Sequence, residues 1–509
     1  MYGERMDKGG EGMAHSGVWR SGRAVVIALA VGAVAVATSA GMMAGVTAGR
    51  TVYPAASPLS AQFQGAFEAG TQAPPGGFYF GARAFDPSSM QASYDLTPLY
   101  QAGLMGAGET IAIVDSFGYP TVASNLETFS KAYGLPMMCG MPGVTCQTGM
   151  PSFRVLMFGN HQVKAPTSSS QSNPYGPSQE QSSGWIGEVA LDTQWAHSIA
   201  PEANILLVVV PTAETLGVQG FPNMMNAEQY VVDHHLANVV TQSFAASEAS
   251  FGSVQSLLNL RHAFITGTEA GITFMAAAGD SGTANSTKTP VGKGGSSIPY
   301  PTVQWPASDP LVTGVGGTNL CTNPATGVGL EPTGGPKACN VTPAQHDVAW
   351  QGSGGGFSEI FPRPPYQDNL PAGSTFSGDM RGVPDVAWQA SCGTFVWVYI
   401  SAQGIPGGYY GICGTSAASP QFAAMVSLAD EMAGTNLGLI NDSLYQLAAG
   451  PDYGMYFNDV TVGNNQTSPS VPGYSASPGW DPVTGLGTPI AANLVPALAA
   501  LGPHTTPVN

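Results

Sequence analysis

The chain has 509 residues, of which 43% are hydrophobic and 9% are charged, so it can bury a large core with few ionic side chains. Asp and Glu number 32 against 15 Lys and Arg, and the resulting net charge of -17 argues against a nucleic acid or an anionic membrane as a partner. A surface with so few ionisable groups changes its charge little on acidification, which suits an acidic environment, although ordinary secreted proteins share this composition.

The N-terminal segment has the pattern of an export signal. Arg20 and Arg23 precede a run of small apolar residues over 24–37, which can be extended to Ala48. We therefore expect residues 1–48 to be a signal peptide or, if uncleaved, a membrane anchor. In both cases the rest of the chain leaves the cytoplasm, and the protein is secreted or is anchored with its main domain outside.

The remainder of the chain is predicted to form one α/β domain. Residues 49–93 are rich in Pro, Gly and Ser, which indicates a linker or a short N-terminal extension. Residues 94–503 show no internal boundary and alternate short apolar runs with helical periodicity, which predicts a central, mostly parallel sheet flanked by helices. The expected strands cover 110–115, 204–210, 239–244 and 272–277, and the expected helices cover 122–133, 184–198, 223–236 and 254–270.

The cysteines predict disulfide bonds. The chain has six cysteines, and none has the CxxC spacing of a metal site. Because their number is even, three bridges are expected in an exported chain. The simplest pairing joins sequence neighbours, and its last bridge would brace the strand that leads into residue 414. The pairs are Cys139 with Cys146, Cys321 with Cys339, and Cys392 with Cys413.

Ser416 follows a small-residue turn at Gly414 and opens an apolar run typical of a helix. A serine at the start of a helix has its hydroxyl and backbone N–H at the positive end of the helix dipole, where an oxyanion can be stabilised. Ser416 is therefore a candidate nucleophile, while a helix cap is an equal alternative from the local sequence. A nucleophile also needs a proton acceptor.

Glu188 and Asp192 are candidates for that acceptor. They are four residues apart on the predicted helix and so lie on one face, among Trp185, Leu191 and Trp195. Like charge and burial would raise their pKa values, which makes one of them a proton acceptor that works best in acid. The alternative is a solvated acidic face.

A Ser-His-Asp triad is the rival arrangement, because Asp115 ends a predicted strand where such an enzyme could keep its aspartate. His197 lies nine residues after Glu188, about half a turn around the helix at roughly 100° per residue, so both cannot face one site. His234 and His235 follow a helix end and are predicted to be surface or capping residues. No histidine has the sequence context of a partner for Ser416.

Asp280 ends a buried strand in a tight turn, at the carboxyl edge of the predicted sheet where α/β sites form. An ionised carboxylate repels an oxyanion, so Asp280 could help only when protonated, by donating its O–H. That condition again implies an acid optimum. A turn-forming Asp before Ser281-Gly282 is the simpler alternative.

Taken together, these residues resemble the sedolisin family of serine-carboxyl peptidases, relatives of the subtilisins in which a glutamate replaces the histidine. The resemblance covers about 94–502 and implies a subtilisin-like three-layer fold. The motif at 414–420 is shared with subtilisin-like enzymes in general. More specific are the motifs at 188–192, 199–203, 277–282, 352–358 and 381–387.

The resemblance assigns roles to matching positions. It implies that Ser416 is the nucleophile, Glu188 the general base and then acid, Asp192 its proton-sharing partner, and Asp280 the oxyanion acid. Asp115 is then structural. The segments at 242–244 and 353–357 are implied to bind the extended peptide substrate.

A structural calcium site is also implied. Two carboxylates and loop carbonyls flank a Gly/Ser/Pro-rich segment, and hard oxygen ligands of this kind suit Ca²⁺, although Asp-rich turns are common. In sedolisins the matching loop holds one calcium ion through two Asp side chains and three carbonyls. The matching residues are Asp459, Val460, Ser477, Gly479 and Asp481.

The sequence thus predicts an exported, monomeric serine-type endopeptidase that cleaves polypeptides in acid through an acyl-enzyme, with tripeptidyl-peptidase activity as a variant. Membrane contact is expected only if residues 1–48 stay attached. Two alternatives remain open. One is a histidine-dependent subtilisin-like peptidase. The other is an inactive or adhesion-type surface protein with the same fold, favoured by the short interval 49–93 where the family usually carries a folded propeptide.

Overall fold

The computed structural model describes residues 73–79, 81–159, 162–164, 179–212, 220–287, 296–402 and 404–508. The predicted export segment, residues 1–48, lies outside these ranges, as does much of the predicted linker. In this part of the chain no helix combines the length and the apolar character that crossing a bilayer requires.

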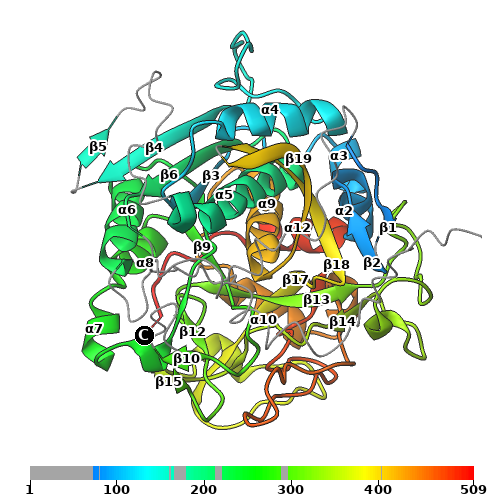
Figure 1. The fold of residues 1–509 in the computed structure, drawn as a ribbon. Coiled ribbons are helices and arrows are strands. Elements are labelled where there is room, and N and C mark those ends of the chain that lie inside the picture. Colours follow the sequence, from blue (N-terminus) through cyan, green and yellow to red (C-terminus); the bar gives the residue numbers. More distant parts are fainter. Residues whose placement is uncertain are drawn as a thin grey trace, which may run out of the picture.

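A nine-stranded sheet lies at the centre of the molecule (Figure 1). Its strands are β3 (Thr110–Ser116), β4 (Phe153–Gly159), β5 (Gln162–Lys164), β6 (Asn204–Val210), β7 (Val239–Gln242), β9 (Thr273–Ala277), β13 (Thr313–Leu320), β14 (Asp347–Ala349) and β17 (Val386–Gln389). Their order is β14-β13-β9-β7-β3-β6-β4-β5, and β17 also pairs with β13. Strands β14 and β5 pair antiparallel with their neighbours, and the other pairs are parallel.

The central strands are buried on both faces. In β3, Ile111 and Ile113 belong to one hydrophobic cluster, whereas Ala112 and Val114 belong to another. The period of two along a strand sends successive side chains to opposite faces, so an apolar run such as Asn-Ile-Leu-Leu-Val-Val-Val in β6 is what a doubly covered parallel strand requires.

Helices cover both faces and complete the predicted three layers. The first face carries α4 (Val122–Tyr133), α5 (Gln179–Ile199), α9 (Thr415–Ala433) and α12 (Ala491–Leu501). The second carries α6 (Phe221–Asp233), α7 (Val254–Leu258) and α8 (His262–Glu269), drawn in green in Figure 1. The α/β architecture predicted from the sequence is therefore confirmed.

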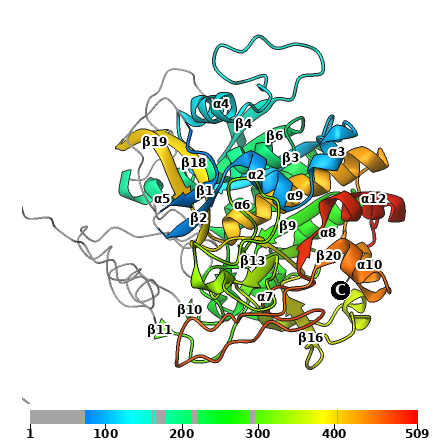
Figure 2. The same ribbon diagram turned by 90° about the vertical axis from the view of Figure 1, so that its right-hand side faces the viewer.

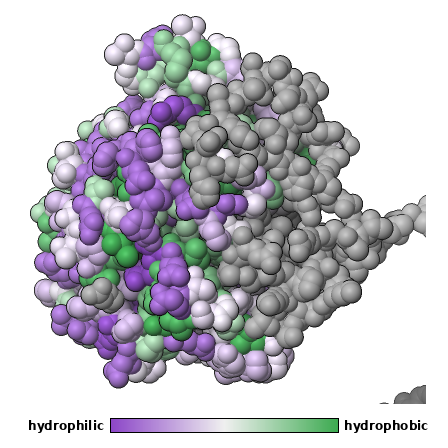
Figure 3. All heavy atoms as spheres, turned by 90° about the vertical axis from the view of Figure 1, so that its left-hand side faces the viewer, coloured by the Kyte–Doolittle hydropathy of each residue, from purple (hydrophilic) through white to green (hydrophobic). Residues whose placement is uncertain are grey.

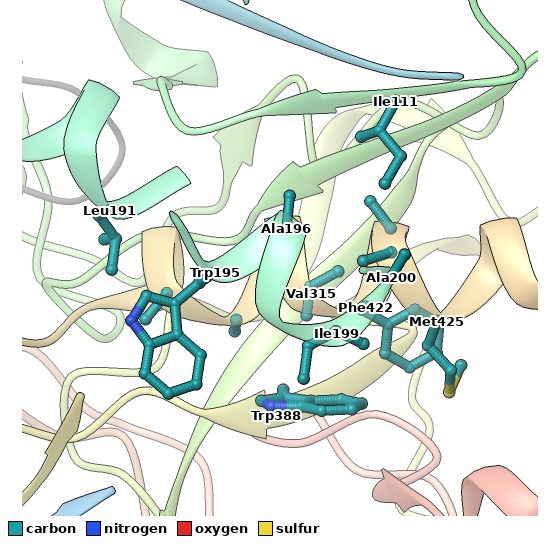
Figure 4. Close-up of a cluster of buried hydrophobic side chains, with 14 of the residues drawn as sticks. Ile111, Leu191, Trp195, Ala196, Ile199, Ala200, Val315, Trp388, Phe422 and Met425 are labelled. Atoms are coloured by element: carbon teal, nitrogen blue, oxygen red, sulfur yellow. The ribbon is translucent and has the colours of Figure 1, made fainter. Parts of the chain in front are cut away.

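Helices α5 and α9 pack against each other on the first face. Trp195 and Ile199 of α5 lie in one cluster with Phe422 of α9 and Trp388 of β17 (Figure 4). The Trp388 and Phe422 rings meet edge to face with their centroids 6.1 Å apart. Burying each such side chain stabilises the fold by about 1.5–3 kcal/mol, so the relative position of the two helices is firmly set.

A second, four-stranded sheet includes part of the predicted N-terminal extension (Figure 2). Its order is β1 (Gly77–Tyr79), β2 (Ala82–Phe85), β18 (Thr394–Ala402) and β19 (Ile405–Ile412). Helix α2 (Pro87–Ser93) follows β2 and is capped by Asp86, whose Oδ1 accepts from Ser89 N at 2.8 Å. Residues 77–93 are thus built into the domain through the pairing of β2 with β18.

Most predicted elements match within a few residues, but the helix expected over 254–270 is wrong as a single element. It is divided into α7 and α8 because the chain turns at Asn259, where Leu260 and Arg261 bond back only three residues. Arg261, the residue directly before α8, forms an ion pair with the buried Asp309, with Nε to Oδ2 at 2.6 Å. The remaining elements are α3 (Thr97–Gln101), α10 (Asn441–Ala449), α11 (Tyr453–Tyr456), β8 (Ala246–Ser247), β10 (Ser286–Thr287), β11 (Ser296–Ser297), β12 (Gln304–Trp305), β15 (Gly356–Pro362), β16 (Met380–Val383), β20 (Phe457–Asn458) and β21 (Thr488–Pro489), with short 3₁₀ turns at Glu248–Ser250, Lys337–Cys339 and Pro365–Asp368.

All three predicted disulfides are confirmed: Cys139–Cys146, Cys321–Cys339 and Cys392–Cys413. Bridges of this number fit an oxidising, extracellular environment. On the face shown in Figure 3, hydrophilic and hydrophobic residues are interspersed, as expected for a surface that is polar with few charges.

Candidate active site

Ser416 is the second residue of α9. Gly414 precedes the helix with φ 124°, a left-handed conformation that favours glycine, and its N–H donates to Ala390 O at 2.7 Å. The Ser416 side chain is buried, and its hydroxyl oxygen has no hydrogen-bond partner among the described residues. The hydroxyl therefore does not cap the helix, and it remains available to react.

Asp280 is bonded to the residue directly before Ser416. Oδ1 of Asp280 accepts from Thr415 N at 2.7 Å and from Thr415 Oγ1 at 2.8 Å, and Thr415 Oγ1 accepts from Gly279 N at 3.0 Å. Burial raises the pKa of Asp280 to about 7, although the two bonds from Thr415 act in the opposite direction. Asp280 is thus a carboxylic acid at mildly acidic pH, adjacent to the turn that carries Ser416.

Glu188 and Asp192 lie on α5 and are both buried, so the alternative of a solvated acidic face is not found. Burial first, and then the charges of Asp115 and Glu188, hold the pKa of Asp192 well above its ordinary value, while the Ser243 hydroxyl lowers it. Asp192 therefore lies among two other carboxyl groups and the Ser243 hydroxyl.

A hydrogen bond connects α9 to β7, the strand that leads to the Ser243 hydroxyl near these carboxyl groups. Thr241 Oγ1 on β7 lies 2.9 Å from Ser419 Oγ on α9. Ser243, beside Asp192, is two residues beyond Thr241, and Ser419 is three residues beyond Ser416, on a neighbouring face of the helix. Strand β7 thus lies against α9 through Thr241, and its continuation reaches Asp192 of α5 through Ser243.

Asp115 belongs to the same group, although the resemblance to the family implied only a structural part for it. It is the sixth residue of β3, is fully buried, and neither of its oxygens has a hydrogen-bond partner within the described residues. Burial raises the pKa of Asp115 to about 8. The only signal in the sequence was a carboxyl group near the carboxyl end of a buried strand, which does not show which residues Asp115 faces.

No described histidine completes a Ser-His-Asp triad, because Asp115 and Ser416 each lack a hydrogen-bond partner within the described ranges. His197 is buried on α5 with Nε2 2.9 Å from Pro136 O, and burial lowers its pKa to about 4. The ring of His234 stacks on Tyr230 with centroids 3.9 Å apart. The predicted orientation of His197 away from the carboxyl pair agrees with this arrangement.

Thr415 and Ser243 lie in segments that the sequence singled out, but their relation to Asp280 and Asp192 was missed. A threonine directly before the candidate nucleophile, and a serine directly after a buried strand, were the only signals available. Asp280, which Thr415 bonds, and Asp192, whose pKa Ser243 lowers, are distant from them in the chain, so both relations depend on the fold.

The five predicted calcium ligands occupy one loop region. Asp459 Oδ1 accepts from Gly479 N at 3.1 Å, and Asp481 accepts from Ser477 N at 3.2 Å through Oδ2 and from Val483 N at 2.8 Å through Oδ1. Burial raises the pKa of Asp481 to about 7 and also raises that of Asp459. Both carboxylates lie close enough to Tyr453 to raise its pKa.

The donor set fits a hard cation. Within the described residues, none of the carbonyl oxygens of Val460, Ser477 and Gly479 accepts a backbone hydrogen bond, so their lone pairs are not used by the loop. Within the described residues, no group of three or more His, Cys, Asp or Glu side chains is placed to hold a metal ion. A site built from two carboxylates and backbone carbonyls does not need a third such side chain.

The chain is similar to known peptidases. It is 30% identical over 450 residues to kumamolisin of Bacillus sp. (strain MN-32), a match that covers 86% of this chain and 67% of kumamolisin. It is 33% identical over 273 residues to tripeptidyl-peptidase 1 of Mus musculus, which covers 50% of this chain and 42% of that relative, so the chain spans less than half of it. No protein-family model matches the chain.

The fold matches a solved structure, "Pseudomonas sedolisin (serine-carboxyl proteinase) complexed with two molecules of pseudo-iodotyrostatin". The TM-score is 0.61 and the identity 23%, over 82% of this chain and 99% of the other, which shows a common fold. The predicted subtilisin-like three-layer architecture is thereby confirmed. With the extent of the match to kumamolisin, the chain belongs to the sedolisin family of serine-carboxyl peptidases.

Proposed function

We propose that the protein is an exported peptidase that cleaves peptide bonds in acid through Ser416, Glu188, Asp192 and Asp280. The observation that carries the proposal is the pair of bonds from Thr415 to Asp280, which hold a carboxyl group of raised pKa at the residue directly before Ser416. The buried carboxyls of α5 supply proton acceptors, and no described histidine offers an alternative to them.

In the acylation step, Glu188 takes the proton of the Ser416 hydroxyl while Oγ forms a bond to the peptide carbonyl carbon. Asp192 shares the proton of the carboxyl pair. The carbonyl oxygen gains negative charge and accepts from the Asp280 O–H and from the Ser416 N–H. Glu188 then gives its proton to the leaving amine as the C–N bond breaks.

Water completes the reaction by the reverse sequence. Glu188 takes a proton from the water, whose oxygen attacks the acyl carbon, and returns it to Ser416 Oγ as the ester bond breaks. Asp280 must stay protonated in both steps, because its anion would repel the oxyanion. Since its pKa is about 7, activity should be lost as the pH rises through that value.

The peptide is proposed to lie along the segment 353–357 and the continuation of β7. Gly354 N donates to Gly279 O at 2.8 Å, and a Cβ on Gly354 would lie 2.0 Å from Ala278 O, so this segment runs directly against the turn that carries Asp280. Extended backbone beside a catalytic turn can pair with a substrate strand. Whether cleavage is internal or releases N-terminal tripeptides is decided by the products of a peptide-library digest.

We also propose one structural calcium ion, held by Asp459 and Asp481 and by the carbonyls of Val460, Ser477 and Gly479. The buried carboxylates with raised pKa values and the unused carbonyls support it, because a cation would stabilise the ionised form of both acids. The ion would fix the loop and would take no part in the chemistry.

The proposal is tested with two variants. Ser416→Ala and Glu188→Gln should each abolish peptide cleavage at about pH 4 while circular dichroism shows a folded protein. Ser427→Ala, in the same helix but bonded only to Ala424 O at 2.7 Å, and Glu269→Gln, at an exposed position, are the matched controls and should stay active. Retained cleavage in Ser416→Ala or Glu188→Gln would show that another group performs the reaction.

A further inference from the structure

The disulfide Cys392–Cys413 joins two segments that meet at the candidate active site. Cys413 follows β19 and precedes Gly414, while Cys392 lies in the turn after β17, and their Cα atoms are 4.9 Å apart. The same two segments share the bond from Gly414 N to Ala390 O at 2.7 Å. The cross-link therefore lies two residues before Thr415.

The turn that holds Cys392 is itself fixed to the central sheet. Ala390 N and Ser391 N both donate to Thr318 O of β13 at 3.0 Å. Gly393 N donates to Ser391 Oγ at 3.0 Å, and Gly393 O accepts from Arg83 N at 2.9 Å, which adds an anchor to the N-terminal strand β2. The partner of Cys413 is thus a rigid point of the fold.

The segment that follows Cys413, residues 414–416, needs to be held in place. Gly414 has no Cβ and adopts φ 124°, a conformation that other residues rarely adopt, so its own chemistry leaves the path of the chain loosely determined. Beyond it, Thr415 must place both its N–H and its hydroxyl on one oxygen of Asp280. A small rotation at Gly414 would lengthen both bonds and would move the Ser416 N–H.

We propose that Cys392–Cys413 is a positioning element of the active site, which holds Gly414 against β13 so that Thr415 keeps both hydrogen bonds to Asp280. The inference rests on the proposed roles of Ser416 and Asp280. It differs from ordinary stabilisation, because opening the bridge should change the chemistry of a protein that is still folded.

The test compares Cys392→Ala/Cys413→Ala with Cys139→Ala/Cys146→Ala. Alanine avoids burying a hydroxyl at position 413, which is buried. Opening the first bridge should lower kcat by about 10- to 100-fold with KM changed by less than about twofold, because misplacement of the reacting groups affects mainly the chemical step. The control removes a bridge in the loop after α4 and should leave kcat unchanged.

The pH profile gives a second readout. The bonds from Thr415 lower the pKa of Asp280, so loosening them should raise it, and the alkaline limb of kcat/KM should move to higher pH. A lower melting temperature with unchanged kcat and unchanged alkaline limb would overturn the inference and leave the bridge a plain structural link.

If the double variant does not fold, the folded wild-type protein is reduced with a water-soluble phosphine and its thiols are alkylated, with mass spectrometry reporting which bridge has opened. Loss of kcat that follows the opening of Cys392–Cys413 supports the inference, and full activity with this bridge open contradicts it. The proposed function is tested separately, since its failure would appear as activity of Ser416→Ala, whatever the state of the bridge.

Discussion

Thr415 donates two hydrogen bonds to the same oxygen of Asp280, from N at 2.7 Å and from Oγ1 at 2.8 Å, both to Oδ1. Because Oδ1 accepts both bonds, the proton of the neutral acid resides on Oδ2, which is buried and has no partner within the described residues. The threonine therefore selects which oxygen of Asp280 carries the donor that a substrate oxyanion would meet.

Replacing this threonine should change both rate and pH dependence. Thr415→Val keeps the N–H bond and the shape but removes the hydroxyl bond, which lowers the pKa of Asp280 in the native protein. We expect kcat to fall by about tenfold and the alkaline limb of kcat/KM, near pH 7 in the native protein, to move upward.

Thr415→Ser is the matched control, because it keeps the hydroxyl that bonds to Asp280. It should retain the native limb. An unchanged limb in Thr415→Val would mean that Asp280 does not set the upper pH limit of activity.

Asp115 offers a test between acid and histidine mechanisms. Burial raises its pKa to about 8, so it is neutral in the folded protein in acid, and Asp115→Asn should keep peptide cleavage at about pH 4 to within about tenfold. A histidine-dependent peptidase would need the ionised carboxylate and would lose its activity. The measurement is the pH–rate profile of the variant beside that of Asp233→Asn, an exposed control.

The sequence was sufficient to predict those helices and strands whose pattern depends only on neighbouring residues. The run Asn204–Val210 is apolar throughout and is found as a strand with those bounds, because a strand covered on both faces needs nothing else. The prediction of one helix over 254–270 was wrong because the helical periodicity continues through Asn259, whereas in the fold Arg261, the residue directly before the second helix, is paired with Asp309. That contact joins residues 48 apart and leaves no local signal.

The same distinction applies to the site. Glu188 and Asp192 could be paired from their spacing of four on one helix. Asp115 could not be added to them, because only the position of β3 beneath α5 makes its charge act on Asp192. The resemblance to a family supplied roles for single residues, whereas the arrangement of their partners required the folded chain.

Stability should fall as the pH rises, in contrast to the usual behaviour of salt-bridged carboxylates. Glu228 on α6 is fully buried, neither oxygen has a partner within the described residues, and burial raises its pKa well above the ordinary value. The unfolded chain ionises this group above about pH 4, so the folded state binds more protons and the free energy of unfolding decreases with rising pH above that value.

Glu228→Gln removes this loss. Its melting temperature should exceed that of the native protein by a few degrees at about pH 7.5 and should equal it at about pH 4, where the glutamate is neutral in both states. Calorimetry at the two pH values measures the difference, and Glu269→Gln is the exposed control. An equal shift of the melting temperature at both pH values would show that the effect comes from packing and not from the ionisation of Glu228.

Calcium should stabilise the loop that holds Asp459 and Asp481. At a free Ca²⁺ concentration of 100 times Kd, binding adds about 2.7 kcal/mol to the free energy of unfolding, which corresponds to a rise of about 3 °C in the melting temperature of a protein this large. Chelation should reverse the rise. Asp459→Asn removes one charged ligand and should abolish the response, whereas Asp452→Asn, on the exposed surface nearby, should keep it. A melting temperature of the native protein that does not respond to Ca²⁺ or to a chelator would show that its own hydrogen bonds, such as that from Val483 N to Asp481 Oδ1 at 2.8 Å, are enough to hold the loop.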